Sequence, residues 1–441
     1  MKALRTIGLL LLIPLVTRSQ NFTTSTWQSV GPEGGYLSSL VQNPASGDLF
    51  TVVYEEPTSR VFKSTNNGDS WNVIAQIQDY YINYLGIDLQ MPATMYAIPS
   101  NLGYENDVHI YKTVDGGLTW SKVTLPGQSS SSHYSTNFHV DKQDPKKLSV
   151  VGYWYLSAYV SFNFRSTDGG ATWSVKTFAN VSTDPFVALC AETDPSDPNT
   201  QYVGGYVIQG GYGYGRLFKT TNNGTSWTDI TGTTIQGYVY DLLIDPSSPN
   251  KVYAANNVSV YRSTDKGASW RAANSGYPYG YKLLFDPKDY STIYAYNCGL
   301  ACYRSSDGGQ TWSALGSGLS GSTCNQLVIS QSSSSIVHAA TCAGYFRSAN
   351  GGQSWTSSNG GLIASEIAVI KCAPSSPRTM YISFMYGGLY KTSNALGKAS
   401  PAAMAAISWQ KMPEYSYCGG IKAIEVSPTD PNVLYIQEGP N

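Results

Sequence analysis

Residues 165–173 read Arg-Ser-Thr-Asp-Gly-Gly-Ala-Thr-Trp, and closely related segments recur along the chain. Each copy has a serine or threonine, then Asp or Asn two positions later, then Gly two positions after that, and ends in Ser-Trp or Thr-Trp. Seven copies are complete, and their Asp or Asn residues are Asn66, Asp115, Asp168, Asn222, Asp265, Asp307 and Asn350. An eighth begins at Lys391 and reaches Ser408-Trp409 only after an alanine-rich insertion. Self-similarity of this kind predicts a stacked repeat architecture.

The side chains of the repeat predict a β-hairpin turn. The Asp or Asn side chain can accept hydrogen bonds from backbone N–H groups a few residues on, which folds the turn locally. The glycine at the fifth position supplies a backbone angle that other residues avoid, and the tryptophan buries a large apolar surface beneath the turn. The seven Asp and Asn residues are therefore expected to be structural, in preference to Ca²⁺ ligands or catalytic acids.

This repeat resembles the Asp-box, or BNR, repeat of the sialidase-like β-propellers. In that family the box is part of the fold at the rim of each blade, away from the functional face. The resemblance therefore implies an all-β, multi-bladed β-propeller with four-stranded antiparallel blades.

A second repeated phrase supplies the rest of each blade. Residues 242–254 read Leu-Leu-Ile-Asp-Pro-Ser-Ser-Pro-Asn-Lys-Val-Tyr-Ala, which predicts two strands around a tight Asp-Pro turn, before the box adds two more. The box tryptophans recur every 42 to 54 residues, a period that fits propeller blades. Thr26-Trp27 looks like the end of a box, and residues 421–437 look like the first two strands of a blade. We therefore expect eight full repeats and a partial blade closed by both chain ends. They would form a single domain over residues 20–441, whose closure is irregular or whose last blade continues beyond the C-terminus.

Composition and the N-terminal residues predict an exported protein. Lys plus Arg number 28 against 29 Asp plus Glu, so charge offers no case for binding nucleic acid. Lys2 and Arg5 precede an apolar run at residues 7–16 that is too short to span a bilayer, which predicts a signal peptide over residues 1–19. No later stretch is long and apolar enough to predict a membrane span. The mature chain is thus expected to be secreted and extracellular.

Sequons and cysteines agree with export. The sequons predict glycosylation at Asn21, Asn180, Asn223 and Asn257. Cys298 and Cys302 flank a short loop between two predicted strands. Cys324 begins one strand and Cys342 ends its neighbour, so each of these two pairs is a candidate disulfide. Three further cysteines stay unassigned, namely Cys190, Cys372 and Cys418. No spacing resembles a zinc site, and we expect neither a metal nor a cofactor.

The functional face is expected on the side of the ring opposite the boxes. Box turns and Asp-Pro turns share one side, so the remaining connections form the other side, and these are rich in aromatic residues. Aromatic rings with hydroxyls suit pyranoses, although many tyrosines are ordinary strand formers that pack between blades. The candidate ligand-binding residues are Tyr153, Trp154, Tyr155, Tyr159, Tyr212, Tyr214, Tyr277, Tyr279, Tyr281, Tyr415 and Tyr417.

Trp154 is the one tryptophan outside the boxes and their remnants. We expect it in an enlarged connection between two strands, where it would serve as an exposed sugar platform. Strand alternation could instead send it inward, between two blades, and both interpretations stay open at this point.

The main functional prediction is a secreted propeller that binds an extracellular glycan or polysaccharide. Sialidase activity is disfavoured because the Arg-Ile-Pro phrase of that family is missing. The repeat wording also resembles the xyloglucanase-type glycoside hydrolases, which use two Asp residues from two propellers facing each other. Only one domain's length is present, so a glycoside hydrolase acting on cell-wall polysaccharide is the alternative, and enzymatic activity is not favoured.

Two further considerations complete the functional prediction. An acid/base pair would come from loop carboxylates, although no spacing singles out two of them. The candidates are Glu55, Glu56, Asp79, Glu105, Asp107, Asp184, Glu366 and Glu414. A third interpretation is a sortilin-like propeller with a peptide or protein partner, which would need a Cys-rich module and a membrane helix.

Overall fold

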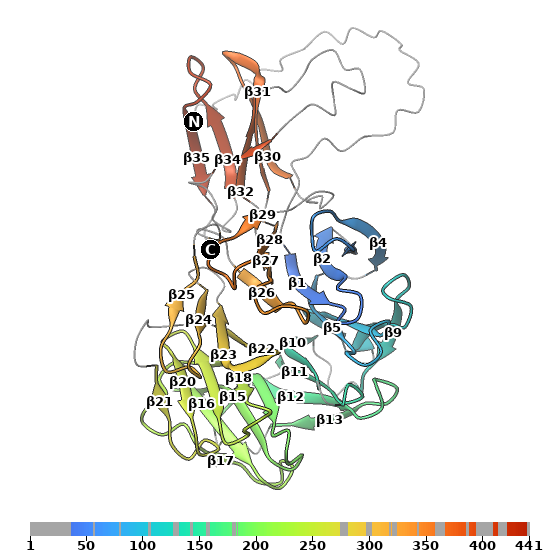
Figure 1. Cartoon of the computed structure of the whole chain (residues 1–441), viewed down its shortest axis with the longest axis vertical. Helices are drawn as coiled ribbons and strands as arrows, with labels where there is room; N and C mark the ends of the chain where they lie inside the picture. Colours follow the sequence, from blue (N-terminus) through green and yellow to red (C-terminus); the bar gives the residue numbers. More distant parts are fainter. Residues whose placement is uncertain are drawn as a thin grey trace, which may run out of the picture.

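The computed structural model is built from β-strands (Figure 1). It describes residues 37–55, 58–78, 81–104, 107–126, 132–141, 144–155, 159–178, 182, 184–273, 281–296, 302–316, 319, 324–341, 344–357, 367–384, 388–393, 409–412 and 421–438. Within these ranges no helix is long and apolar enough to cross a membrane.

Seven consecutive sheets, called blades 1 to 7 here, follow one another from residue 37 to residue 357. Blade 1 consists of β1 (Leu37–Gln42), β2 (Leu49–Glu55), β3 (Thr58–Ser64) and β4 (Asn72–Ile77). Blade 2 consists of β5 (Ile82–Ile87), β6 (Met95–Pro99), β8 (His109–Thr113) and β9 (Ser121–Thr124). Blade 3 consists of β10 (Ser132–Val140), β11 (Leu148–Tyr155), β12 (Tyr159–Ser166) and β13 (Ser174–Thr177), with β7 (Asn101–Tyr104) added beside β10. Blade 4 consists of β14 (Phe186–Thr193), β15 (Gln201–Gln209), β16 (Tyr212–Thr220) and β17 (Thr228–Asp229).

The remaining sheets continue the pattern. Blade 5 consists of β18 (Val239–Ile244), β19 (Val252–Asn256), β20 (Val260–Ser263) and β21 (Arg271–Ala272). Blade 6 consists of β22 (Lys282–Asp286), β23 (Asp289–Tyr296), β24 (Tyr303–Ser305) and β25 (Ser313–Ala314). Blade 7 consists of β26 (Cys324–Ile329), β27 (Val337–Thr341), β28 (Gly344–Ser348) and β29 (Thr356–Ser357). An eighth sheet contains β30 (Ile367–Ala373), β31 (Ser376–Phe384), β32 (Gly388–Thr392) and β33 (Gln410–Lys411), and the last pairs β34 (Ile421–Val426) with β35 (Leu434–Glu438). These antiparallel sheets confirm the all-β class and the four-stranded blade.

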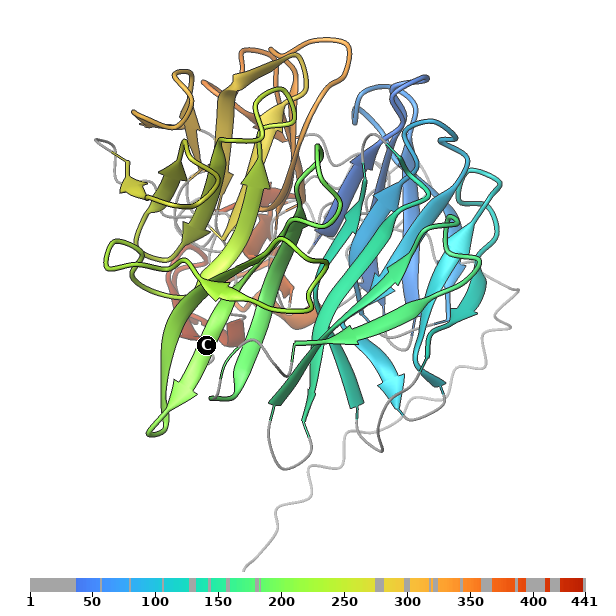
Figure 2. The same ribbon diagram turned by 90° about the horizontal axis from the view of Figure 1, so that it is seen from below.

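The seven blades contact one another in a closed cycle (Figure 2). The first strand of blade 1, β1, packs against both β5 of blade 2 and β26 of blade 7. Gln326 Oε1 on β26 accepts a hydrogen bond from Ser39 Oγ at 2.7 Å and from the Leu40 amide at 3.1 Å. Blades 5 and 6 are joined in the same way, because Asp241 Oδ2 accepts the Leu283 amide at 2.8 Å. Blade 7 therefore meets blade 1 through an ordinary inter-blade contact.

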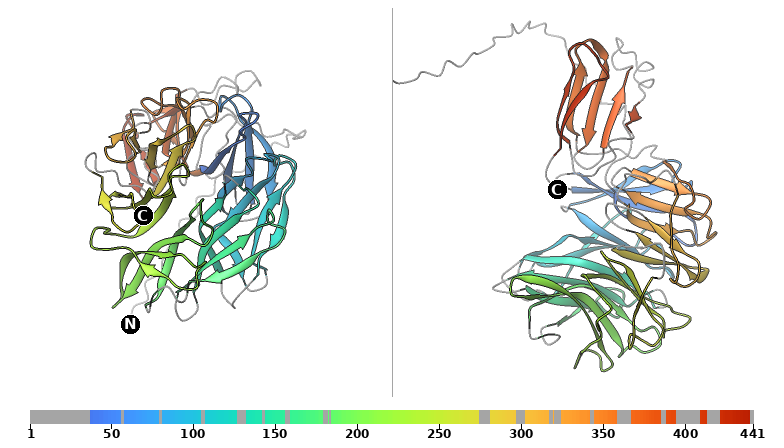
Figure 3. Two further views of the ribbon diagram at one scale, coloured as in Figure 1. Left: turned by 60° about the horizontal axis from the view of Figure 1, so that its bottom comes forward. Right: turned by 90° about the vertical axis from the view of Figure 1, so that its left-hand side faces the viewer.

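The sheets β30–β33 and β34–β35 stand beside this ring (Figures 1 and 3). Ile424 of β34 packs in one apolar cluster with Tyr381 and Leu389, and the Tyr381 hydroxyl donates to the Pro431 carbonyl at 2.6 Å. The expected closure by both chain ends differs from this arrangement, because blade 7 already fills the position next to blade 1. Thr26, Trp27 and the predicted signal peptide lie outside the described residues.

The boxes form the turns between the third and fourth strands of the blades. Asp168 Oδ1 accepts the Ser166 hydroxyl at 2.8 Å and the Thr172 amide at 2.9 Å, while Oδ2 accepts the Thr172 hydroxyl at 2.5 Å. In the copies with Asn, the side-chain NH₂ donates instead, as from Asn222 Nδ2 to Ser226 Oγ at 2.9 Å. Asp and Asn therefore hold the same turn, which explains why both occur.

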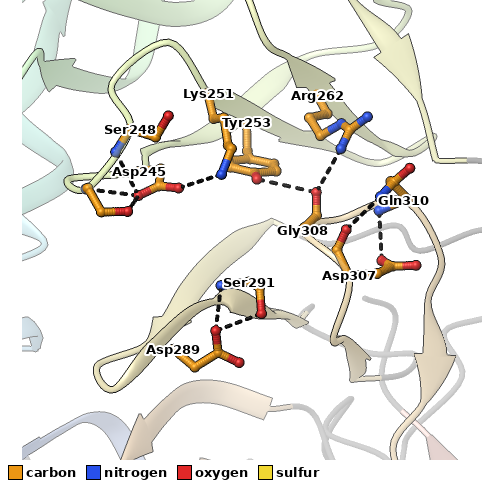
Figure 4. A network of polar contacts seen from close by, with 11 residues as sticks. Asp245, Ser248, Lys251, Tyr253, Arg262, Asp289, Ser291, Asp307, Gly308 and Gln310 are labelled. Carbon is orange, nitrogen blue, oxygen red and sulfur yellow. Dashed lines mark hydrogen bonds and ion pairs between the residues drawn. The ribbon is translucent and has the colours of Figure 1, made fainter.

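The fourth residue of the box turns its carbonyl toward the preceding blade, because it adopts a left-handed backbone conformation. The φ angles are 56° at Asn67, 69° at Gly169 and 69° at Gly308. In the contact between blades 5 and 6, the Gly308 carbonyl accepts the Tyr253 hydroxyl at 3.2 Å and Arg262 Nη1 at 3.4 Å (Figure 4). We call such a contact a seam.

The same seam recurs around the ring, including its closure. The matching tyrosine hydroxyl bonds are Tyr96 to Gly169, Tyr202 to Lys266, Tyr294 to Gly351, and Tyr345 to Asn67 between blades 7 and 1. The glycine that follows the left-handed residue is required by space as well as by backbone angle, since a Cβ on Gly68 would lie 2.2 Å from the Tyr345 ring. In five of the seven contacts of the ring, the box thus fastens its blade to a tyrosine of the preceding one. Blades 1 and 3 carry Phe50 and Ser149 in place of the second-strand tyrosine.

Candidate functional site

A band of tyrosines lies on the side of the ring opposite the boxes. It runs across blades 3 to 6, and its members are Tyr134, Tyr153, Tyr159, Tyr206, Tyr238, Tyr240 and Tyr281. All are half-buried except Tyr134, which is 37% exposed. We call this set the tyrosine band.

Within blade 3 the band follows from strand pairing. Tyr134 on β10 and Tyr153 on β11 are cross-strand partners, so their rings share a face and stack with centroids 5.6 Å apart. Tyr159, at the start of β12, meets Tyr153 edge-on at 5.5 Å. The three rings therefore form one continuous aromatic surface at the end of the blade.

The band crosses from blade 4 to blade 6 by ring contacts between blades. Tyr206 on β15 stacks on Tyr238 with centroids 4.4 Å apart. Gly213 leaves the room that Tyr238 needs, because a Cβ there would lie 2.2 Å from the Tyr238 hydroxyl oxygen. Tyr240 lies at the β-bulge of β18, between the paired residues Val239 and Asp241, and its ring centre is 4.1 Å from that of Tyr281.

Burial and neighbouring phenols raise the pKa of two tyrosines of the band. Burial first, and then the phenols of Tyr281 and Tyr238, raise the pKa of Tyr240 to about 12. Burial and the phenols of Tyr159 and Tyr153 also raise the pKa of Tyr206. The hydroxyls of Tyr240 and Tyr206 therefore stay protonated at neutral pH, where each can both donate and accept a hydrogen bond.

Charged groups flank the band at the inner strands. Asp241 Oδ1 lies 3.7 Å from Lys282 Nζ and accepts from Asn137 Nδ2 at 3.4 Å, while Oδ2 accepts the Leu283 amide. These residues come from blades 3, 5 and 6. Because protein donors occupy both oxygens of Asp241, its role is to join blades.

Trp154 corrects one expectation from the sequence. It is 5% exposed and stacks on Phe162, with centroids 5.2 Å apart and the planes at 17°. Neighbouring residues of a strand point to opposite faces, so Tyr153 enters the band whereas Trp154 enters the core between blades 2 and 3. The prediction of an enlarged connection was also wrong, because β11 extends to Tyr155 and β12 begins at Tyr159. Trp154 is therefore a packing residue between two blades, and the prediction of an exposed sugar platform was wrong.

The other candidate aromatic residues divide into three groups. Tyr153, Tyr159 and Tyr281 join the band. Tyr212 and Tyr214 are 72% and 46% exposed on β16, on the sheet face opposite Gly213 and away from the Tyr206–Tyr238 stack. Four candidates and the side chain of a fifth lie outside the described residues, namely Tyr277, Tyr279, Tyr415, Tyr417 and Tyr155. Four members of the band were not among the candidates, namely Tyr134, Tyr206, Tyr238 and Tyr240. The place of Tyr134 opposite Tyr153 follows from strand pairing.

The described part of the chain does not bring together a pair of candidate carboxylates. Asp107 forms an ion pair with Lys122 at 2.6 Å, and Asp184 accepts a hydrogen bond from Gln209 Nε2. The other loop candidates, or their side chains, lie outside the described residues. Within the described ranges no group of three or more His, Cys, Asp and Glu could hold a metal ion.

The predicted disulfides and glycosylation sites are only partly described. Cys302 and Cys324 are buried in the cluster around Tyr296, whereas Cys298 and Cys342 lie outside the described residues, so both pairings stay predictions. Cys190 is buried and Cys372 exposed; Cys418 lies outside the described residues. Asn223 and Asn257 are exposed, and Asn21 and Asn180 are not described.

Comparison with known proteins gives partial sequence matches. The family model described as sortilin, neurotensin receptor 3, matches residues 215–342. Xyloglucanase Xgh74A of Acetivibrio thermocellus is 28% identical over 279 residues, or 58% of this chain and 27% of that protein. A xyloglucanase of Paenibacillus sp is 24% identical over 245 residues, or 46% of this chain and 23% of that protein. The chain thus spans about a quarter of the length of these relatives.

Solved structures with a similar fold include YCF48 from Cyanidioschyzon merolae. The TM-score is 0.49 at 14% identity, over 74% of this chain and 98% of that one. Together, the repeated boxes, the four-stranded blades and the matches to sortilin and the xyloglucanases place the chain in the superfamily of Asp-box, Vps10-like β-propellers.

Proposed function

We propose that this chain is the polysaccharide-binding propeller of a glycoside hydrolase that acts on xyloglucan or a related β-glucan, and that the tyrosine band holds the polymer. The observation that carries the proposal is the band itself, with seven neighbouring phenols across four blades on the side opposite the boxes. The relatives named xyloglucanases supply the substrate class. The hydrolase interpretation therefore replaces simple glycan binding as the preferred function.

The chemistry of the band suits a neutral polysaccharide. Aromatic rings bury the C–H faces of pyranoses, and phenol hydroxyls bond the sugar hydroxyls at the rim. The raised pKa of Tyr240 and Tyr206 keeps these two phenols neutral at neutral pH. A surface of this kind holds an uncharged chain better than an acidic one.

Hydrolysis of a glycosidic bond needs two carboxyl groups in addition to a binding surface. Asp107 and Asp184 are each engaged by a neighbouring side chain, and Asp241 joins blades. The proposal therefore assigns polymer binding to the band. It assigns acid and base to carboxylates other than these three, among them Glu56, Asp79, Glu105, Glu366 and Glu414.

Binding and cleavage can be tested on the same preparation. The full chain would be run in native gels that contain xyloglucan, mixed-linkage β-glucan or mannan, and reducing ends would be measured after incubation with each polymer. We expect retardation by xyloglucan. Tyr134→Ala and Tyr281→Ala should each weaken it by about 1–3 kcal/mol, by analogy with the loss of one stacking ring.

Tyr435→Ala is the matched control, because Tyr435 is 67% exposed on β35, away from the band. It should bind like the wild type, and melting temperatures should show that all variants are folded. Unchanged retardation in both band variants would refute the band as the polymer site. Binding without release of reducing ends would support the simple binder instead.

A second candidate function is peptide binding of the sortilin type. It is favoured by the family match to residues 215–342, which covers blades 5 and 6 and parts of blades 4 and 7. The same band could then hold aromatic or apolar peptide side chains. Peptides and soluble xyloglucan oligosaccharides would be added as competitors in the same gels. Relief of the retardation by peptides but not by the oligosaccharides would favour this function.

A further inference from the structure

Blade 5 departs from the other repeats beside its box, on the face opposite the tyrosine band. In every described box, the residue immediately before the serine or threonine is Lys or Arg. It lies on the third strand and pairs with the first residue of the fourth strand. In blade 5 this pair is Arg262 and Arg271. The other seven pairs are Lys63–Asn72, Lys112–Ser121, Arg165–Ser174, Lys219–Thr228, Arg304–Ser313, Arg347–Thr356 and Lys391–Gln410. Arg271 alone replaces an uncharged residue with a cation.

The fold gives no reason for this second arginine. Like charges directly opposite each other on neighbouring strands destabilise a sheet. Arg262 serves the seam, because its Nη1 donates to the Gly308 carbonyl (Figure 4), whereas Arg271 is exposed. Among the described residues no carboxylate forms an ion pair with either arginine, and residues 274–280, which follow β21, contain no acid. The positive charge at this place is thus uncompensated by an ion pair.

The two arginines line a hollow that a small ligand could enter. Its volume is about 260 Å³, and its walls are Arg262, Thr264, Ser269 and Arg271. The nearest carboxylate of the hairpin, Asp265, is held within its own turn by the Ser263 and Ser269 hydroxyls at 2.7 and 2.5 Å. The hollow is therefore lined by two arginines and two hydroxyl residues, with no carboxylate in its walls.

We propose that this hollow binds a tetrahedral oxyanion, namely a sulfate or phosphate group. A guanidinium group offers N–H donors in a planar fork that matches two oxygens of such an anion, and two neighbouring arginines can bind the same anion together. An anion between the guanidinium groups also removes the repulsion across the strand pair. The group could be an inorganic ion or the sulfate ester of a glycan. The site is independent of the polysaccharide function proposed above.

The test compares the wild type with Arg271→Ser, which restores the residue found at this position in blades 2, 3 and 6. Sulfate and phosphate would be titrated into the full chain by calorimetry at low ionic strength. We expect saturable binding to the wild type, and at least about tenfold weaker binding to Arg271→Ser, because a charge-assisted hydrogen bond is lost. Lys146→Ser is the control, since it removes one exposed cation from a turn on the same side. It should bind like the wild type.

Two further arms sharpen the result. Arg271→Lys keeps the charge without the fork, so it should bind several-fold more weakly than the wild type; unchanged affinity would refute the fork geometry. A sulfated oligosaccharide that binds more tightly than inorganic sulfate, only when Arg271 is present, would identify a glycan ester as the ligand, and equal affinity would identify the free ion. Equal sulfate binding by the wild type and folded Arg271→Ser would overturn the site.

Discussion

The box face and the tyrosine face of the ring differ in how far they repeat. On the box face, blade after blade offers the same hydroxyl donor and the same left-handed carbonyl, as in the bonds from Tyr253 to Gly308 and from Tyr345 to Asn67. On the other face each blade contributes different tyrosines, from Tyr134 in blade 3 to Tyr281 beside blade 6. Repetition therefore marks what holds the ring together, and departures from it point to places where function could reside.

The largest expected effect concerns a residue that looked functional in the sequence. Trp154→Ala should lower the free energy of unfolding by about 3–5 kcal/mol, because it leaves a cavity against Phe162 in the core between blades. Tyr212→Ala, at a ring that is 72% exposed on β16, should change it by less than about 0.5 kcal/mol. Urea unfolding of both variants measures the difference. A stable Trp154→Ala protein would contradict the buried placement.

The next effect concerns the seam that closes the ring. His338 replaces the second-strand tyrosine in blade 7, and its Nδ1 bonds the Tyr345 hydroxyl at 2.7 Å, which in turn donates to Asn67 of blade 1. Burial, and then the charge of Arg347, lower the pKa of His338 to about 4. The unfolded chain takes up this proton near pH 6.5, so stability is complete above that pH and falls between pH 6.5 and 4.

The loss from His338 amounts to about 3 kcal/mol by linkage. Unfolding by urea at several pH values should therefore show a shallower decline for His338→Gln than for the wild type over this range. A parallel decline in the two proteins would show that the seam does not sense acid.

The smallest expected effect tests the equivalence of Asp and Asn in the boxes. Asp168→Asn should leave the melting temperature at pH 7 nearly unchanged, because Asn222 and Asn350 hold the same turn with an NH₂ group. Asp168→Ala should lower it by removing the acceptors of the turn. The Thr172 hydroxyl and amide, with Ser166, lower the pKa of Asp168 to about 2.

Asp168→Asn should also change how the stability of the protein depends on pH. The ordinary pKa of an aspartate is about 3.9, so the wild-type contribution is present above that pH and is lost as pH falls toward 2. Asp168→Asn should lack this part of the acid sensitivity. Thermal melts between pH 5 and 2 compare the two proteins, and identical profiles would argue against the hydrogen bonds to Asp168.

The sequence predicted the local turns well and the closure of the ring poorly. The spacing of Ser166, Asp168, Gly170 and Trp173 contains the whole hairpin, so local chemistry is sufficient. The number of blades in a ring depends instead on the angle between neighbouring sheets. The repeat continues past Trp355 into β30–β33, and its box is interrupted only after Lys391, so nothing near blade 7 marks that this blade meets blade 1.

The candidate site was predicted in outline for a similar reason. The side of the ring and its richness in tyrosine followed from counting turns. Individual side chains depend on strand ends and bulges: Tyr240 lies at a bulge, and Trp154 points away from Tyr153 because β11 is longer than expected. Alternation identifies a face only once the extent and irregularities of the strand are known.

The seam also gives the stack of blades a direction. Each blade presents a phenol or cation on one side and a left-handed carbonyl on the other, so neighbours associate head to tail rather than through identical patches, as in a heterologous interface. In an open stack of such units, the donors of the blade at one end and the carbonyl of the blade at the other end have no neighbouring blade to bond. In a closed ring every blade has a neighbour on both sides. Tyr435, which occupies the position of Tyr381 on the second strand of its sheet, is 67% exposed and so displays the donor face of the stack outside the ring.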